Sequence, residues 1–177
     1  MKIERMGFTV HEIENGKTLK LNDDLNLTIY AADDCDPILC YKFLGCANLF
    51  EKNGSQQIDS ISVISNNNYT IVNTNDCPFE LSKSVLKKIK DRFKNIDVLL
   101  TGYGGAGPYP QCVDNFSLEQ KKIEAKKKEE NFLDKTIEYL RVLKPKYYLP
   151  FAGTYTLSGK LSNLQNLRGV PVIDDAY

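Results

Sequence analysis

Apolar and polar residues alternate along the first part of the chain, which predicts β-strands. Over residues 7–32 apolar positions recur at every second residue, interrupted by polar turns at 14–17 and 22–24. Residues 58–74 repeat this alternation on both sides of Asn66-Asn67-Asn68, and asparagine tolerates the left-handed backbone of a tight turn. Period two places alternate side chains on one face of a sheet, so we expect a meander followed by a hairpin.

The spacing changes in the second half of the chain. Apolar residues recur at three and four over residues 81–93, and a long helix is predicted from Ser117 to Leu143, as expected for amphipathic helices. The long helix carries its predicted apolar stripe at Phe132, Leu133, Ile137 and Leu140. Its first half is rich in lysine and glutamate, which favours a solvated face with ion pairs four residues apart over a nucleic-acid surface.

Short apolar segments separate and follow these helices. Residues 96–101 form an apolar run without alternation, which is typical of a central strand covered on both faces. Further strands are predicted at 147–149 and 170–173, with a short helix at 158–167. Strands first, then helix, strand, helix and strand predict an α/β (α+β) fold: one domain over 1–177 with a mixed β-sheet and helices on one face.

Charge and composition narrow the function. The chain has 23 Lys and Arg against 23 Asp and Glu, and this balance argues against a dedicated nucleic-acid binder. No apolar run is long enough to span a membrane, and the N-terminus lacks the apolar stretch of a signal peptide. Five cysteines without a C-x-x-C pair favour reduced thiols and a cytoplasmic protein.

A single histidine, His11, restricts the chemistry further. Hydrolytic zinc sites commonly use two or three histidines, and the chain has neither a G-x-S-x-G elbow nor a G-x-x-x-x-G-K-[ST] loop. A Cys–His dyad would need His11, which is remote in sequence from every cysteine. The chain alone is therefore expected to lack the usual histidine-dependent catalysis.

Candidate ligand groups follow the ends of predicted strands, where α/β proteins place them. Asp33, Asp34 and Asp36 form either a cation site, for magnesium or calcium, or a solvated turn. Asp76 is either a cation ligand or an ordinary turn cap. The loop 102–110 is rich in glycine; it is either a wide loop that needs positive φ or a close backbone approach to a ligand, with Gly104 and Gly105 between the walls Tyr103 and Tyr109.

Four segments in order resemble the C-terminal part of metallo-β-lactamase-fold proteins, namely 57–64, 70–78, 96–106 with Tyr109-Pro110, and 143–153. The most similar groups are the L-ascorbate-6-phosphate lactonase-like branch and the CMP-N-acetylneuraminate hydroxylase branch. The resemblance spans about residues 16–153 and implies one half of an αββα sandwich. Its N-terminal half, which carries the family's His-x-His-x-Asp-His motif, would be absent from this chain.

The resemblance also implies a ligand set with gaps. Asp76 matches the family's bridging aspartate, and Asp33 or Asp34 stands where a histidine is usual. The segment Pro150-Phe151 is followed by Ala152 where the family has another histidine. Zinc or iron would serve the intact family protein, whereas carboxylates without imidazole hold transition metals weakly, so this chain alone would hold metal weakly or not at all.

Two interpretations follow from the resemblance. In the first, the intact protein is a metal-dependent hydrolase or a relative that acts on a phosphorylated or nucleotide-linked sugar, and this chain alone is inactive. In the second, the chain is a non-catalytic binding or assembly module with a degenerate metal site. Half of a sandwich exposes an apolar face, so the expected partners are the missing N-terminal half, a second chain, or the chain itself in an oligomer.

Overall fold

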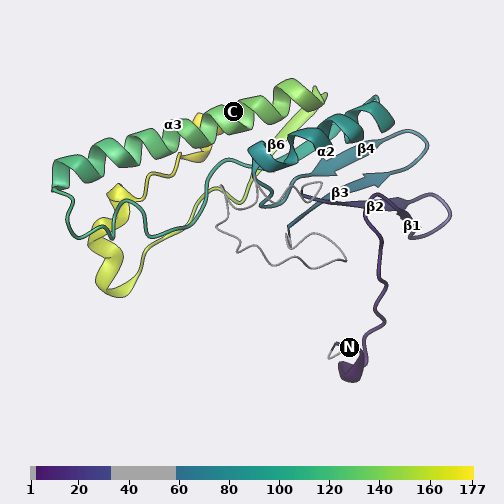
Figure 1. Cartoon of the computed structure of the whole chain (residues 1–177), viewed down its shortest axis with the longest axis horizontal. Coiled ribbons are helices and arrows are strands. Elements are labelled where there is room, and N and C mark those ends of the chain that lie inside the picture. The colour runs from purple at the N-terminus through teal and green to yellow at the C-terminus, as the bar shows by residue number, and fades with distance from the viewer. Residues whose placement is uncertain (1–2, 33–58) are drawn as a thin grey trace.

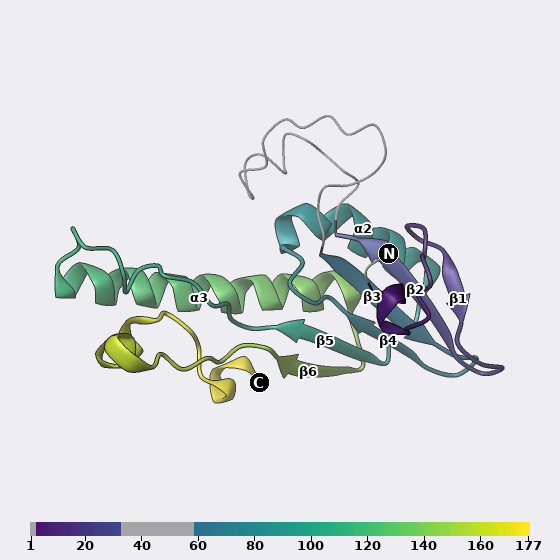
Figure 2. The ribbon, with the colours of Figure 1, turned by 90° about the horizontal axis from the view of Figure 1, so that it is seen from below.

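The computed structural model describes residues 3–32 and 59–177, and its strands form a single sheet in chain order (Figure 2). The strands are β1 (Thr18–Lys20), β2 (Asn26–Ala31), β3 (Ser60–Ser65), β4 (Thr70–Asn73), β5 (Val98–Gly102) and β6 (Tyr147–Phe151). Strands β1 to β4 pair antiparallel, whereas β4, β5 and β6 pair parallel. The predicted mixed sheet is therefore confirmed.

Two helices connect the parallel strands and lie together on one side of the sheet (Figure 1). Helix α2 (Phe79–Arg92) links β4 to β5, and α3 (Leu118–Leu143) links β5 to β6. The core lies between this helical layer and the sheet, where buried Ile61, Val63 and Leu99 belong to the same cluster as Leu86 and Ile89 of α2. The α/β class with helices on one face is confirmed.

Helix α3 has well-defined ends, and three of the four residues of its predicted apolar stripe are at least half-buried, Leu140 against the core. Ser117 accepts a hydrogen bond from the backbone amide of Gln120, whose side chain bonds back to Ser117 in a capping box. Its buried residues are Ala125, Thr136, Tyr139 and Leu143, while Ile137 is 42% exposed. The prediction was wrong at Ile137 because hydroxyl groups with partners occupy the buried face. Thr136 donates to the carbonyl of Phe132, which satisfies a polar group inside the interface.

Two predicted strands do not form. Residues 7–13 contain no strand, and Phe8 is 61% exposed; the alternation there has no neighbouring strand to pair with among the described residues. The segment 170–173 leads into a 3-10 helix, η3 (Ile173–Ala176), because Pro171 has no amide to donate to a ladder. The short helix predicted at 158–167 is confirmed as the 3-10 helix η2 (Gly159–Leu167), and a further one, η1, covers Glu4–Met6.

Strand β5 also differs from its prediction. Along Val98–Gly102 buried and half-buried residues alternate, so within the described part of the chain only the helix-facing side is covered. Coverage of both faces is therefore not seen within the described residues. A non-alternating apolar run places apolar side chains on both faces of the strand. It does not show whether another element packs on each face.

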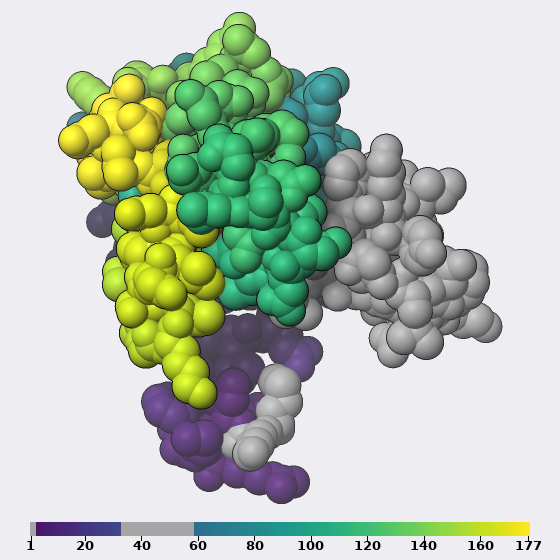
Figure 3. Space-filling model, turned by 90° about the vertical axis from the view of Figure 1, so that its left-hand side faces the viewer, coloured from purple at the N-terminus to yellow at the C-terminus, as the bar shows by residue number. Residues whose placement is uncertain are grey.

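The charged half of α3 is solvated, as predicted, although its ion pairs are three residues apart rather than four. Lys122 pairs with Glu119, and Lys127 pairs with Glu124. The C-terminal segment packs beside this half of α3 (Figure 3), where Lys128 donates to the carbonyl of Arg168 at 2.9 Å. None of the described helices combines the length and the apolar character that crossing a membrane requires.

Candidate functional site

A cleft of about 690 Å³ opens at the carboxyl ends of β4, β5 and β6. It is lined by residues 75–79 after β4, by 101, 102 and 104–106 at the end of β5, and by 152–155 after β6. Helix α3 closes one side with Phe132, Lys135 and Tyr139. Parallel strands bring three loops to the same edge of the sheet, and this is the edge where α/β folds bind ligands.

The end of β4 is held in a defined shape. Thr74 is fully buried, and its hydroxyl donates to the hydroxyl of Thr101 at 2.7 Å, joining β4 to β5 beneath the cleft. Asn75 has a left-handed φ of 48° and donates from its side-chain amide to the carbonyl of Ser60 at 2.6 Å. This turn presents Asp76 at the exposed rim of the cleft. Non-glycine residues with positive φ carry a conformational cost and are frequent at functional sites.

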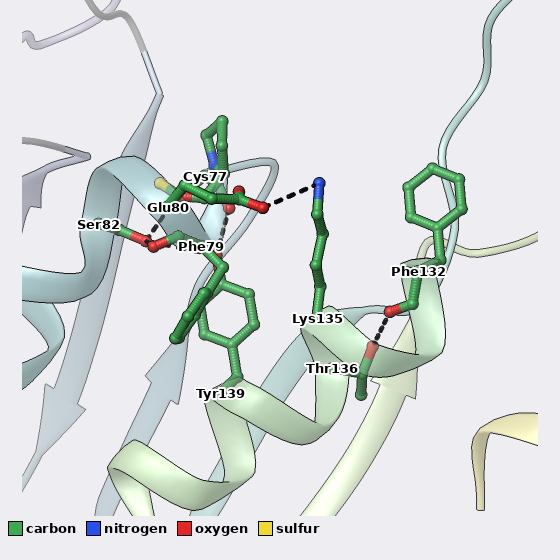
Figure 4. A network of polar contacts seen from close by, with 9 residues as sticks. Cys77, Phe79, Glu80, Ser82, Phe132, Lys135, Thr136 and Tyr139 are labelled. Atoms are coloured by element: carbon green, nitrogen blue, oxygen red, sulfur yellow. Dashed lines mark hydrogen bonds and ion pairs between the residues drawn. The ribbon is translucent and has the colours of Figure 1, made fainter. Parts of the chain in front are cut away.

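Tyr139 of α3 organises the entry to α2 (Figure 4). It is buried, and its hydroxyl donates a hydrogen bond to the carbonyl of Cys77. Its ring contacts Phe79 edge-on, with centroids 5.1 Å apart. Burial raises the pKa of the Tyr139 hydroxyl far above its ordinary value, so this group stays a protonated donor. It fixes the residues at which α2 begins.

The first turn of α2 and Lys135 contribute positive charge to one side of the cleft. Pro78 occupies the N-cap position without a side-chain cap, so the amides of the first turn contribute the positive end of the helix dipole. The ammonium of Lys135 lies 3.3 Å from the carboxylate of Glu80, and both side chains remain about one third exposed (Figure 4). Lys135 thus stands beside the start of α2, with Glu80 as its present partner.

The loops after β5 and β6 approach each other too closely for side chains. A Cβ atom on Gly104 would lie 2.4 Å from the carbonyl oxygen of Gly153, and one on Gly153 would lie 2.2 Å from the ring of Tyr103. Ala152, which precedes this contact, has a left-handed φ of 51°. The two loops therefore form one continuous floor for the cleft, made largely of backbone.

Aromatic residues form the outer walls. Gly105 faces the ring of Phe132, which a Cβ atom would reach at 3.0 Å. Tyr155 lines the cleft after β6, and the guanidinium of Arg168 lies 5.3 Å from the centre of its ring. Flat apolar surfaces, a backbone floor and a lysine beside a helix start together suit a small polar ligand with an anionic group.

The structure brings together only some of the predicted site residues. Asp76, Gly104 and Gly105 all line the cleft. Tyr103 lies beneath the floor, buried, with its hydroxyl 3.1 Å from that of Thr154, so it supports the cleft rather than walling it. Tyr109 donates to Glu124 of α3 at 2.5 Å and is not among the lining residues.

The predicted metal ligands Asp33 and Asp34 lie outside the described residues, as does Asp36. Near Asp76 the structure adds Asp59, whose carboxyl pKa is raised by burial and by the neighbouring charge of Asp76. Over residues 3–32 and 59–177, no three histidine, cysteine or acidic side chains are grouped to hold a metal ion. Two carboxylates without imidazole do not fit a zinc or iron centre, so no catalytic step is assigned to a metal here.

Sequence reasoning missed Lys135, Phe132 and Tyr155 as parts of the site. The spacing of Phe132, Lys135 and Tyr139, three and then four residues apart, places them on one face of α3, and this signal was available in the sequence. It was obscured because Phe132 was assigned to an apolar stripe. No sequence pattern indicated Tyr155, which reaches the cleft through the loop after β6.

No family model, curated protein or solved structure matches this chain. The resemblance to the metallo-β-lactamase fold therefore stays a prediction.

Proposed function

We propose that this chain is a non-catalytic binding module whose cleft binds a phosphorylated or nucleotide-linked sugar. The observation that carries the proposal is the cleft of about 690 Å³ at the carboxyl ends of three parallel strands, lined by Lys135 and by the uncapped start of α2. Its volume falls in the range of small-molecule sites. Lys135 stands beside the start of α2 on one side of the cleft, which suits a ligand whose negative charge is also at one end.

Each part of such a ligand has a complementary group in the cleft. A phosphate is favoured where helix amides and an ammonium converge, which is the corner of Lys135 and the first turn of α2. A sugar ring has an apolar face that stacks on aromatic side chains, here Phe132 and Tyr155. The exposed carboxylate of Asp76 accepts hydrogen bonds from sugar hydroxyls at the rim.

The hydrolase interpretation remains a prediction for a longer or assembled protein. Hydrolysis by a metal-bound water needs about three protein ligands and an open position. The described residues place Asp59 and Asp76 near each other, and that pair alone falls short of the requirement. Binding without turnover is therefore the function assigned to this chain.

Calorimetric titration of the full chain tests the proposal, with glucose 6-phosphate, UDP-N-acetylglucosamine and glucose as probes. We expect a phosphorylated probe to bind at least tenfold more tightly than glucose, since a charge-assisted contact contributes about 1.5–3 kcal/mol. Lys135→Met should remove most of that preference. Lys126→Met is the matched control, because Lys126 is an exposed lysine of the same helix and is not among the residues lining the cleft.

Three results would contradict the proposal. The first is equal affinity for glucose and its phosphorylated forms. The second is no binding of any probe at millimolar concentration. The third is an equal loss of affinity in both lysine variants, which would show that net charge alone attracts the phosphate.

A further inference from the structure

The face of the sheet opposite α2 and α3 carries a continuous apolar row across all six strands. Strand pairing aligns Leu19 with Leu27, Leu27 with Ile64, Ile64 with Ile71, Ile71 with Val98, and Val98 with Tyr147. Residues paired in this way point to the same face of a sheet. This row, hereafter the outer row, therefore runs from one edge of the sheet to the other.

A second row lies beside it, two residues further along the strands. It consists of residues that pair from β2 to β6, namely Ile29, Ser62, Asn73, Leu100 and Leu149. The residues between the two rows are the buried ones that face the helices, such as Val63, Val72 and Leu99. The two rows thus form one surface, the outer face, whose only polar members are Ser62 and Asn73.

No described element covers this outer face. Within residues 3–32 and 59–177, both α-helices lie on the other side (Figure 1). Tyr147 is 71% exposed and Leu149 48% exposed, and the other apolar members in β2 to β5 are half-buried by their own neighbours. Contiguous apolar surface of this kind marks an interaction site in a folded protein.

The lack of charged residues on the outer face favours a partner whose surface is also uncharged. Charged residues make up 26% of the chain, yet neither row contains one. A partner with a charged surface would have to lose hydration there without gaining an opposite charge. A second copy of this chain presents the same uncharged face, and a two-fold axis brings each row of one copy against the rows of the other.

The size of the face sets the strength of such an association. Six strands about 4.8 Å apart and roughly 16 Å long give about 450 Å² of flat surface per copy. Two copies would then bury about 900 Å², which lies below the 1,200–2,000 Å² of stable specific interfaces. The association is accordingly weak and reversible.

We infer that two copies of this chain pair through their outer faces and form a two-sheet sandwich with helices on both outsides. The aligned packing of two sheets about 10 Å apart is a common solution for an apolar sheet face. This pairing does not involve the ligand cleft, which opens at the carboxyl ends of the strands. It is therefore independent of the proposed sugar binding.

Sedimentation velocity from about 5 to 500 µM tests the inference with the full chain. Wild type should shift from monomer to dimer across this range. Ile71→Lys, at the centre of the outer row, should weaken the dimer at least tenfold because it would bury two ammonium groups. Leu118→Lys is the control: Leu118 is 62% exposed but lies on α3, so this variant should dimerise like wild type.

A second variant keeps the test valid if Ile71→Lys fails to fold. Tyr147→Lys changes an exposed residue at the edge strand, and its circular dichroism spectrum and melting temperature should match those of wild type while its dimer weakens. A wild type that stays monomeric at 500 µM would overturn the inference. So would a dimer that survives both Ile71→Lys and Tyr147→Lys, or a series of larger species without a dimer plateau.

Discussion

The hydroxyl of Tyr139 in α3 donates a hydrogen bond to the backbone carbonyl of Cys77, the residue that leads into α2. This contact joins the two helices at the point where the cleft begins. The same hydroxyl lies 3.4 Å from that of Ser82, which itself bonds the carbonyl of Pro78 at 2.8 Å. Packing of the helical layer and the shape of the ligand site therefore depend on one buried network.

Replacing Tyr139 with phenylalanine tests this network. The variant keeps the ring that packs on Phe79 and removes only the hydroxyl, and with it the hydrogen bond to the carbonyl of Cys77. We expect a loss of about 1–2 kcal/mol in the free energy of unfolding, measured by urea denaturation. Tyr69→Phe, at a residue 63% exposed, should change stability by less than about 0.5 kcal/mol. Equal effects in the two variants would contradict the assigned role of the buried hydroxyl.

The floor of the cleft gives a second prediction. Gly104→Ala would place a methyl group against the backbone of Gly153, which cannot move away without shifting the loop. We expect a loss of about 1–3 kcal/mol in stability and weaker binding of glucose 6-phosphate. Gly107→Ala is the matched control in the same loop, since a Cβ atom there meets nothing within 4 Å. Thermal unfolding and calorimetry of both variants measure the difference, and a fully stable Gly104→Ala would show that the loops are not in tight contact.

Asp97 connects the starts of three strands, and its interactions predict how the stability of the fold changes at low pH. Its carboxylate accepts bonds from Lys146 at 2.7 Å and from the amide of Thr70 at 2.8 Å. The bond from Lys146, and then that from Thr70, lowers the pKa of Asp97 below its ordinary value of 3.8. A lowered folded-state pKa stabilises the fold above the unfolded-state value, and this contribution is lost as pH falls through the folded-state value.

Asp97→Asn should therefore melt a few degrees below wild type at pH 7, and the gap should narrow as pH falls below about 4. Asp114→Asn is a control for net charge, because Asp114 lies in the loop before α3. Melting temperatures across pH 2–7 provide the measurement. A gap that stays constant down to pH 2 would mean that the ionised carboxylate is not what stabilises the strand starts.

For Asp59 we expect a pH dependence of stability opposite to that of Asp97. Burial, and then the charge of Asp76, raises its pKa above 3.8, so folding favours the protonated form. Its stabilising contribution is present below the unfolded-state pKa and is lost as pH rises through the folded-state value. Asp59→Asn should accordingly raise the melting temperature at pH 7 and leave it unchanged near pH 3. Asp76→Asn should have the same sign, since it removes the other charge. A lower melting temperature for both variants at pH 7 would show that the carboxylates of Asp59 and Asp76 do not repel each other in the folded protein.

Local patterns predicted the fold where the pattern and the packing agree. Ile61 and Val63 alternate with polar residues and form a strand, and Val85, Leu86 and Ile89 recur at helical spacing and form the buried face of α2. Residues 7–13 alternate as well, but alternation does not reveal whether a neighbouring strand is present. Pairing is a tertiary property, and for this segment the sequence contained no information about it.

The same distinction applies to the site. Asp76, Gly104 and Gly105 were predicted because strand ends can be located from the sequence, and the parallel order of β4 and β5 then brings them together. Lys135 was missed because its role depends on how α3 packs against α2. Its spacing from Phe132 and Tyr139 places it on their face of the helix, but this spacing does not show that the face meets α2, and the contact with Glu80 does.

The ion pair between Glu80 and Lys135 predicts that the cleft is partly inhibited by its own carboxylate. Glu80 holds the ammonium that would otherwise face a phosphate, and it also lies in the first turn of α2. Glu80→Gln should strengthen binding of glucose 6-phosphate by a few-fold, because it removes a competing negative charge while preserving side-chain size. Glucose should bind the variant as it binds wild type. Calorimetry at low and high salt measures the effect, which should shrink as salt screens the charges. Weaker phosphate binding by Glu80→Gln would show instead that Glu80 positions Lys135 for the ligand.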